Sequence, residues 1–278
     1  MEKKIERSDI MRVAFILVNY NNFNISINNV YNILSLDGNI KRDIFVVDNA
    51  SEKDDIDNLE KGLPKYNNVK LLKSDKNLGY FGGLNYGLKQ LEYKKYDYIV
   101  IANNDLIYRY DFLVKLSENK YKDNCLAIVP ELITINGKYQ NPQLVNKPSK
   151  FRLLGYNLYY TCYFLSIIIE LIYGTFFRKK SKESRRISNK TDIFLCTGAC
   201  IVLNSKFIDK CGYLDDSVFM WGEEVLIAHQ IEVAKGVMTY DPSLYVLHFE
   251  NATVRKISSK KTYQLNKKSF KVYKKYYK

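Results

Sequence analysis

The sequence is poor in the residues from which metal centres and disulfide frameworks are built. It contains two histidines, His229 and His248, and five cysteines in 278 residues. The number of cysteines is odd, no paired spacing recurs, and Cys196 and Cys200 have no second pair of ligands. A structural zinc site is therefore disfavoured, and reduced thiols of the cytosolic kind are expected.

Several familiar signatures are also missing. Residues 1–11 contain no apolar segment of the kind found in secretory signals. The glycine-rich stretch at 77–87 has neither the GxGxxG spacing of dinucleotide-binding proteins nor the Gly-Lys-Ser/Thr end of a Walker loop. No RNP, KH or zinc-finger pattern occurs, and no internal repeat stands out. These absences argue against the common dinucleotide and nucleic-acid modules.

Positive charge is abundant but unevenly placed, within a formal net charge of +13. Residues 251–278 hold ten Lys or Arg and no acid, and residues 178–190 hold seven against the single acid Glu183. Hydrophobic residues make up 46% of the chain, so a disordered protein is excluded and a sizeable core is expected.

The first hundred residues alternate between apolar runs and helix-like segments. The runs lie at 13–18, 44–47, 69–72 and 98–102. Continuous apolar runs are typical of strands covered on both faces, and their alternation with helices predicts a parallel sheet with right-handed crossovers. Further strands are expected at 125–135 and 244–247, with mostly helix between 204 and 236. The predicted fold class is α/β, with a Rossmann-like, mixed but mainly parallel sheet flanked by helices.

Polar side chains follow three of these strands. They are Asn19, Asp48 and the triplet Asn103, Asn104 and Asp105. In such sheets ligands bind beyond the carboxyl ends of the strands, so three polar ends on one rim indicate a binding crevice. A carboxylate such as Asp105 can bind Mg²⁺ or Mn²⁺, although an Asn/Asp turn with a helix cap is the favoured explanation of the triplet when it is taken alone.

Two other places could carry chemistry. Glu223 and Glu224 follow an aromatic patch with the only Trp, Trp221. One of the two acids could act as a base while the other orients a loop or binds an acceptor hydroxyl; a solvated helix start is the alternative. His248 follows a short strand and is either a metal ligand or a hydrogen-bonded core histidine.

The order of these motifs is more specific than any one of them. VNYN, VVDNAS, NLGYFGGLNYG, NND, TGA, FMWGEE and a late His succeed one another along residues 11–250. This succession resembles the family 2 glycosyltransferases with the GT-A fold, and is closest to the non-processive, rhamnosyltransferase-like members. The QxxRW motif of processive synthases is absent.

The resemblance implies a donor site at the strand ends. Asn19 and Asp48 would line the nucleotide pocket, with Asp48 near the base or ribose. The loop beside the nucleotide would be shaped by Asn77, Gly79 and Gly83.

The resemblance also implies a metal and a base. Asp105 would hold a divalent cation, Mn²⁺ or Mg²⁺, that bridges the diphosphate, and His248 would be an auxiliary ligand. Asn103 or Asn104 would contact the donor sugar or ribose. Glu224 takes the position of the usual base, the second acid of a Glu-Asp pair.

Two departures from the family pattern concern this base. Glu224 is one methylene longer than the usual Asp, and Leu226 stands where a further Asp often follows. The implied activity is inverting, metal-dependent hexosyl or rhamnosyl transfer from a UDP- or dTDP-sugar to a glycan or lipid-linked saccharide, in cell-surface polysaccharide synthesis. The alternatives are a catalytically silent relative that acts as a partner or membrane scaffold, and a nucleic-acid-binding protein that uses the basic tail.

Residues 153–177 are apolar and carry one charge, Glu170. This length could span a bilayer, but a span here would separate the two halves of the implied domain, so a surface helix or helical hairpin is expected. A buried or oligomer-forming helix is the alternative. Basic residues suited to anionic headgroups follow at once: Arg178, Lys179, Lys180, Lys182, Arg185 and Arg186.

The expected organisation is thus a transferase domain over 1–250 with a helical insert at 151–190, followed by a basic tail at 251–278. The tail alternates lysines with aromatic residues and is expected to contact the same membrane, or to be a solvated helix. Together these features predict a peripheral protein at the cytoplasmic face of the cell membrane.

Overall fold

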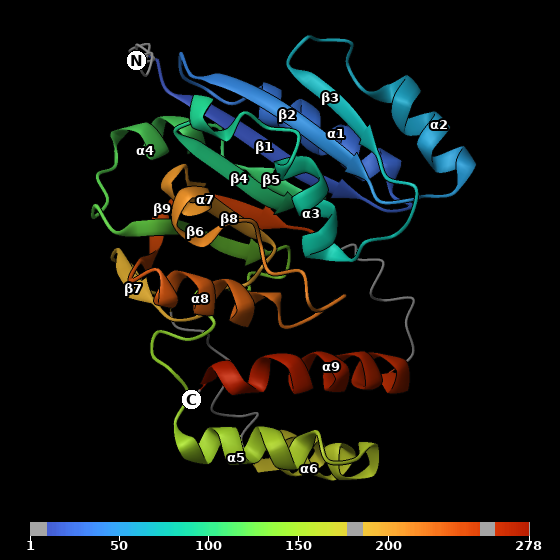
Figure 1. Cartoon of the computed structure of the whole chain (residues 1–278), viewed down its shortest axis with the longest axis vertical. Helices are drawn as coiled ribbons and strands as arrows, with labels where there is room; N and C mark the ends of the chain where they lie inside the picture. Colours follow the sequence, from blue (N-terminus) through green and yellow to red (C-terminus); the bar gives the residue numbers. More distant parts are fainter. Residues whose placement is uncertain (1–9, 177–185, 251–258, 278) are drawn as a thin grey trace.

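The structure is a computed structural model that describes residues 10–176, 186–250 and 259–277. Its centre is a nine-stranded mixed sheet (Figure 1) in the order β3-β2-β1-β4-β8-β6-β9-β5, with β7 paired to β9. The strands are β1 (Arg12–Asn19), β2 (Lys41–Asp48), β3 (Val69–Lys73), β4 (Tyr98–Asn103), β5 (Leu106–Tyr108), β6 (Cys125–Thr134), β7 (Thr191–Ile193), β8 (Cys200–Asn204) and β9 (Val237–His248).

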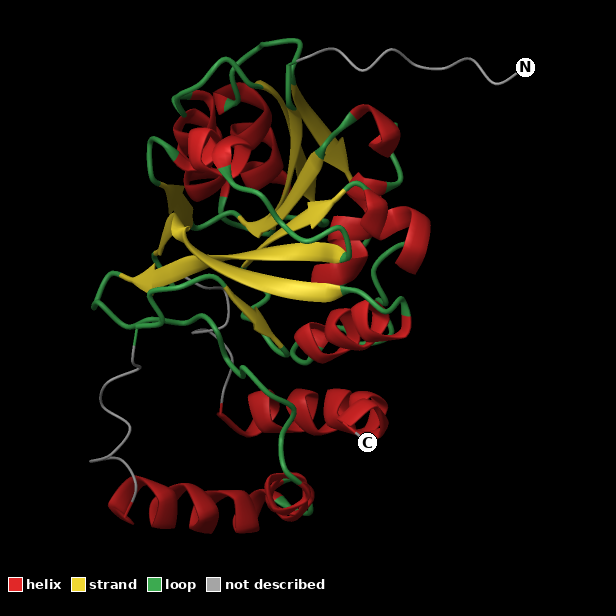
Figure 2. Ribbon diagram, turned by 90° about the vertical axis from the view of Figure 1, so that its left-hand side faces the viewer, coloured by secondary structure: helices red, strands yellow, loops and turns green. Residues whose placement is uncertain are grey.

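Helices lie on both faces of this sheet and in a separate layer beside it (Figures 1 and 2). They are α1 (Phe23–Leu34), α2 (Lys53–Gly62), α3 (Tyr80–Leu88), α4 (Phe112–Glu118), α5 (Lys150–Tyr159), α6 (Tyr163–Phe176), α7 (Lys206–Cys211), α8 (Glu223–Val233) and α9 (Ser259–Tyr273), with the 3₁₀ turns η1 (Tyr93–Lys95) and η3 (Lys274–Tyr277). The predicted α/β class is confirmed.

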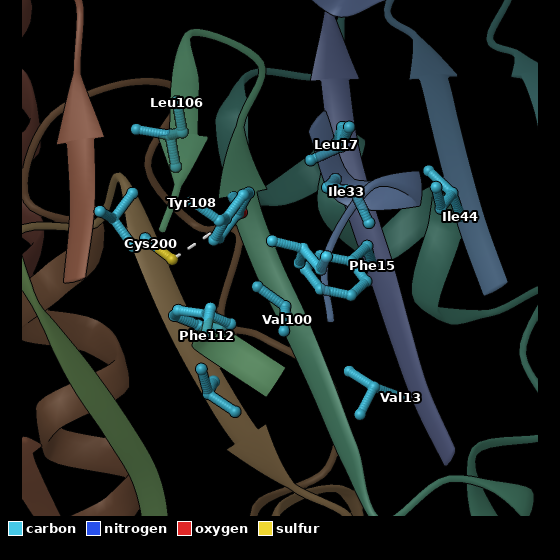
Figure 3. Close-up of a cluster of buried hydrophobic side chains, with 14 of the residues drawn as sticks. Val13, Phe15, Leu17, Ile33, Ile44, Val100, Leu106, Tyr108, Phe112 and Cys200 are labelled. Carbon is cyan, nitrogen blue, oxygen red and sulfur yellow. Dashed lines mark hydrogen bonds between the residues drawn. The ribbon is translucent and has the colours of Figure 1, made fainter. Parts of the chain in front are cut away.

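Side chains of β1 alternate between two cores because successive residues of a strand point to opposite faces. Val13, Phe15 and Leu17 pack with residues of α1 and α4 on one face (Figure 3). Ala14 and Ile16 pack with residues of α3 and α8 on the other. Both sets are fully buried, which explains why the sequence of this strand is an uninterrupted apolar run.

The first four strands of the order are parallel, and their register brings their polar ends together. Asn19 on β1 pairs with Asp48 on β2, and Val18 pairs with Asn103 on β4. β8 then runs antiparallel to β4. The rim predicted from the sequence is therefore a single edge of the sheet.

The basic C-terminal helix α9 is not a solvated helix. Phe270, Tyr273 and Tyr277 recur on one helical face and are buried in a cluster with residues of α8, such as Val225 and Leu226. The sequence expectation that the aromatic residues of the tail face a membrane is wrong for these three. They pack inward because α8 and the loop before it present an apolar surface to them.

The apolar insert forms a helical hairpin, α5 followed by α6, as expected. It lies on the far side of α9 from the sheet (Figures 1 and 2). Among the described residues, no helix combines the length and the apolar character that crossing a bilayer requires. Of the basic residues after the hairpin, Arg178, Lys179, Lys180, Lys182 and Arg185 lie outside the described residues.

The expectation for Arg186 is wrong. This residue was expected to meet lipid headgroups, but its guanidinium lies 2.7 Å from the carboxylate of Glu131, whose side chain is buried on β6. Arg186 takes this position because the buried carboxylate of Glu131 needs a positive partner.

The last strand is longer than expected from the sequence, since β9 starts at Val237. A register shift next to Asp241 interrupts its pairing with β6, which is why only its last residues stand out in the sequence.

Candidate active site

A chain of hydrogen bonds connects the polar ends of β1, β2 and β4. The Asn19 amide donates to the Asp48 carboxylate at 3.0 Å, and its oxygen accepts from the Ser26 hydroxyl at 2.7 Å. The same hydroxyl accepts from the Asn104 amide at 2.7 Å. Three of the residues predicted from the sequence are thus held in one network, with Ser26 on α1 as the link between them.

Asn19 and Asp48 are fully buried. The Asp48 carboxylate also accepts from the backbone N–H of Ser51 at 3.1 Å, so it fixes the loop that follows β2. Both side chains are therefore buried under the rim and support it through their hydrogen bonds. Direct contact of Asp48 with a nucleotide stays a prediction.

The glycine-rich loop packs against the loop that precedes α8. Gly79 has φ +77°, and a Cβ at this position would lie 2.3 Å from the carbonyl oxygen of Phe219. The Asn77 side chain accepts from the Gly79 N–H at 3.0 Å and from the Asn49 amide at 3.2 Å. A Cβ on Gly83 would lie 3.3 Å from the Asn49 amide nitrogen. Glycine is required at 79 because two backbones meet there.

Asp105 and His248 lie side by side, although 143 positions separate them in the sequence. The Asp105 carboxylate is 3.2 Å from His248 Nε2, and both side chains are nearly buried. Pairing of β5 with β9 places them there, since Leu106 is the partner of His248. The two predicted metal ligands are therefore brought together, while the Asn103 backbone N–H is bonded to Ala199 on the other side of β4.

The tautomer of His248 follows from its neighbours. The Gln140 amide nitrogen donates to the Glu250 carboxylate at 2.8 Å, which turns the Gln140 amide oxygen toward His248 Nδ1 at 2.7 Å. An amide oxygen only accepts, so Nδ1 carries the proton. In neutral His248 the lone pair of Nε2 then faces Asp105.

The Nε2 lone pair and the carboxylate repel each other unless a proton on Nε2 or a bound cation lies between them. Carboxylate oxygen and imidazole nitrogen both suit Mn²⁺, and a histidine ligand ordinarily donates its other N–H to an acceptor, as His248 does to Gln140. The described residues contain no cluster of three His, Cys, Asp or Glu side chains that could hold a metal unaided. Asp105 and His248 therefore fit a cation that is shared with a ligand, here the expected diphosphate.

Glu224 rests on the Thr197–Gly198 turn. The Gly198 N–H donates to its carboxylate at 3.2 Å, and a Cβ on Gly198 would lie 3.2 Å from the same oxygen. The Thr197 hydroxyl donates to the backbone carbonyl of Gln140 at 2.9 Å. Gln140 thus contacts His248 through its side chain and the Glu224 turn through its backbone.

Tyr80 joins the two halves of the site. Its hydroxyl donates to the Gly198 carbonyl at 2.9 Å. Desolvation raises the Tyr80 pKa well above its usual value, and the nearby carboxylates of Glu223, Glu224 and Asp105 raise it further. The charges of the two predicted acids of α8 and of the predicted metal ligand therefore all act on the Tyr80 phenol.

The adjacent acids Glu223 and Glu224 differ in access. Glu223 is buried, and desolvation followed by repulsion from Glu224 raises its pKa to about 8. Glu224 is half-buried, and desolvation raises its pKa too. Glu224 is thus the more accessible of the two acids, and its role as a base stays a prediction. The loop before these acids is strained, since Trp221 has φ +64° and Gly222 φ +98°.

Sequence reasoning missed three residues of this network: Ser26, Tyr80 and Gln140. Tyr80 lies within the glycine-rich motif, where only the glycines and Asn77 were considered. Gln140 lies between the strand expected at 125–135 and the apolar insert, 108 positions from its partner His248. No local pattern could have identified it, because its role depends on a contact across the fold.

The model of glycosyl transferase family 2 matches residues 15–212. The chain belongs to this family. The match ends before Glu223, Glu224 and His248, so their place in the site rests on the geometry described above. The resemblance seen in the sequence is confirmed, whereas the rhamnosyl subtype stays a prediction. No curated protein matches the chain.

Solved structures share the fold. GalNAc-T7 with UDP, GalNAc and Mn²⁺ superposes with a TM-score of 0.66 at 13% identity, covering 95% of this chain and 48% of that one. S. aureus TarS 1–349 in complex with UDP-GlcNAc gives 0.54 at 14% identity, covering 89% and 62%. This family 2 chain therefore has the GT-A fold and spans about half to three fifths of the length of these proteins.

Proposed function

We propose that this family 2 glycosyltransferase transfers a sugar, with inversion, from a UDP- or dTDP-sugar to a hydroxyl of a saccharide acceptor. The observation that carries the proposal is a run of contacts from Asp105 to Glu224: Asp105 lies 3.2 Å from His248, and hydrogen bonds connect His248 through Gln140 to the turn that holds Glu224. These contacts support the assignment of Asp105 to a diphosphate-bound cation and of Glu224 to the base. Solved GT-A structures that contain UDP, or UDP-GlcNAc, support the donor class.

The proposed reaction is a single displacement. The acceptor oxygen attacks the anomeric carbon, the bond from that carbon to the phosphate oxygen breaks, and the nucleoside diphosphate leaves. Glu224 takes the proton of the attacking hydroxyl, and its raised pKa makes it a stronger base than an exposed acid. Glu223 is buried beside it at the start of α8, and its pKa of about 8 keeps it mostly protonated near neutral pH.

Asp105 and His248 would hold a divalent cation, Mn²⁺ or Mg²⁺, against the diphosphate. When bound, such a cation neutralises the charge that builds up on the leaving group. The donor sugar or ribose would contact Asn103 or Asn104, which are half-buried at the end of β4. The presence of Mn²⁺ in the GalNAc-T7 structure supports this assignment.

Leu226 replaces an acid that often follows the base, and the packing gives a reason. It is fully buried in the cluster between α8 and α9. Here the start of α8 is held by apolar contacts, so the base remains positioned without the second acid. This argues for an active enzyme over a silent scaffold.

The acceptor is proposed to be a glycan or a lipid-linked saccharide of cell-surface polysaccharide synthesis. The transferase unit would comprise residues 1–250, including the insert at 151–190, with the tail from 251 onward as a support. The exposed hairpin α5–α6 and the lysines of α9 support a peripheral location at the cytoplasmic face of the membrane.

Thermal unfolding with nucleotides tests the donor site. UDP or dTDP with Mn²⁺ should stabilise the wild type by about 2.7 kcal/mol at a hundredfold excess over its Kd. Asp105→Asn should lose this metal-dependent gain. Glu224→Gln should keep it but lower the rate of transfer by roughly 10²–10⁴, because only the base is removed.

Asp123→Asn is the matched control, since Asp123 is exposed before β6, far from this rim. It should leave both stabilisation and transfer unchanged. Retained turnover in Glu224→Gln removes Glu224 from the role of base. Nucleotide stabilisation without transfer in the wild type would favour the silent relative.

A further inference from the structure

The hairpin α5–α6 exposes a row of large apolar side chains. On α5 the row is Phe151, Leu154 and Leu158, and Phe151 is 87% exposed. This spacing of three and four positions defines one helical face. α6, the second helix of the hairpin, also exposes Phe164 and Leu171. Several large apolar side chains exposed on one hairpin indicate a site of interaction.

A groove of about 680 Å³ opens beside this row, between α5 and α9. Leu154 belongs to both, so the groove is continuous with the exposed face. Its walls combine apolar side chains with three lysines: Leu153, Leu154, Phe270, Lys150, Lys274 and Lys275.

The lysines around the groove have no carboxylate partner in the part of the chain that the structure describes. α9 carries five lysines, η3 carries two, and neither contains an acid. In α5 and α6 the single acid is Glu170, which is hydrogen-bonded to the Tyr159 hydroxyl. Among the described residues, no carboxylate pairs with Lys150, Lys274 or Lys275.

We propose that the outer face of the hairpin lies in the headgroup region of an anionic bilayer, and that a lipid phosphate enters the α5–α9 groove beside Lys150, Lys274 and Lys275. Apolar side chains next to a basic rim match the two parts of such a lipid. A second copy of this chain is the poorer occupant, because two like faces would bring their unpaired lysines together.

This inference extends the peripheral membrane location given in the proposed function. It rests on that location alone and not on the proposed donor site. The hairpin is tied to α9 by hydrogen bonds from Tyr263 to the Tyr159 carbonyl and from Lys267 to the Thr161 carbonyl. The opposite side of α9 contacts the loop before Glu224, through Ser269 and the Met220 carbonyl at 2.8 Å. A bilayer bound here would lie one helix away from the proposed base, on the side from which a lipid-linked acceptor could arrive.

Flotation with vesicles tests the proposal with the full chain. Binding is expected to vesicles that mix phosphatidylglycerol with phosphatidylcholine and not to phosphatidylcholine alone. The triple variant Lys150→Gln, Lys274→Gln, Lys275→Gln should lose on the order of a hundredfold in affinity, since each cation near the surface contributes about one decade or less. Phe151→Ser with Leu154→Ser should also weaken binding.

The matched control is Lys53→Gln, Lys61→Gln, Lys70→Gln, which removes the same charge from exposed positions on and near α2, at the other end of the molecule (Figure 1). It should bind vesicles as the wild type does. Equal losses in both triple variants, or equal binding to neutral vesicles, overturn the proposal in favour of a general charge effect.

Two further outcomes also overturn it. A dimer that disappears in Phe151→Ser assigns the face to a second copy, and release from vesicles by inorganic phosphate beyond that by chloride at equal ionic strength assigns the groove to free anions. Thermal stabilisation by nucleotide, measured on the same samples, tests the donor site independently of membrane binding. A chain that binds vesicles but no nucleotide refutes the donor site alone.

Discussion

At the scale of single residues, the site depends on acids held away from water. Glu223 is buried beside Glu224 at the start of α8, where its charge is opposed by desolvation and by its neighbour. Such a carboxyl binds a proton more tightly in the folded chain than in the unfolded one. Ionisation of Glu223 therefore lowers the free energy of unfolding. The same burial raises the pKa of Glu224 and makes it a stronger base.

We expect the wild type to lose stability between about pH 4.5, the ordinary pKa of a glutamate, and about pH 8, the raised pKa of Glu223. The folded state binds more protons across this window, so the free energy of unfolding falls as the pH rises. In Glu223→Gln the decrease in the free energy of unfolding across this pH range should be smaller by on the order of 2 kcal/mol. Chemical denaturation at a series of pH values measures it.

Glu92→Gln provides the control for this series, because Glu92 is exposed and pairs with Lys95 on the surface. Its stability should follow the wild-type pH profile. If the profile of Glu223→Gln runs parallel to that of the wild type, the burial of Glu223 does not control its ionisation.

At the scale of elements, α9 determines the shape of the loop that leads to the proposed base. Gly222 has φ +98°, and a Cβ there would lie 2.1 Å from the Tyr273 ring. Ser269 holds the same loop through the Met220 carbonyl. This arrangement could not be predicted from the sequence, because the basic helix and the FMWGEE motif are separate segments that only packing brings together.

Gly222→Ala should destabilise the chain by more than its backbone strain alone. The left-handed conformation costs about 1–2 kcal/mol for alanine, and the clash with Tyr273 adds to it. Transfer should fall as well, since a misplacement near 1 Å can cost about a hundredfold. Urea unfolding and initial rates measure the two effects.

Gly137→Ala separates strain from clash. Gly137 has a similar φ of +76°, but a Cβ there meets nothing within 4 Å. It should cost the backbone term and leave transfer unchanged. Equal costs for Gly137→Ala and Gly222→Ala would show that Tyr273 does not constrain the loop.

Across the elements, prediction from sequence succeeded where residues are local neighbours. The apolar runs before Asn19, Asp48 and Asn103 identified β1, β2 and β4, because strands buried on both faces leave a continuous apolar signal. The glycine at 79 followed from its motif. Gln140 and Arg186 could not be predicted, because each pairs with a residue on a distant strand, and their own sequence surroundings resemble ordinary loop.

At the scale of the whole molecule, stability is distributed unevenly. The sheet has buried clusters on both faces, whereas α5 contains no buried residue and rests on α9 through a few aromatic contacts, such as Tyr160 stacked on Phe270. The hairpin therefore has few buried contacts to keep it packed against the rest of the described structure. Local opening follows such differences in buried contacts.

Hydrogen exchange should report this division directly. Backbone amides at the centres of β1 and β4 should exchange only through global unfolding, because both strands are covered on both faces. Amides of α5 should exchange orders of magnitude faster, because local opening there exposes little that was buried. Anionic vesicles should then slow exchange in α5 and α6 and leave β1 unchanged, while neutral vesicles should change neither. Slow exchange of α5 in the absence of lipid would mean that another surface already covers the hairpin, and the apolar row would then belong to an interface between copies of the chain.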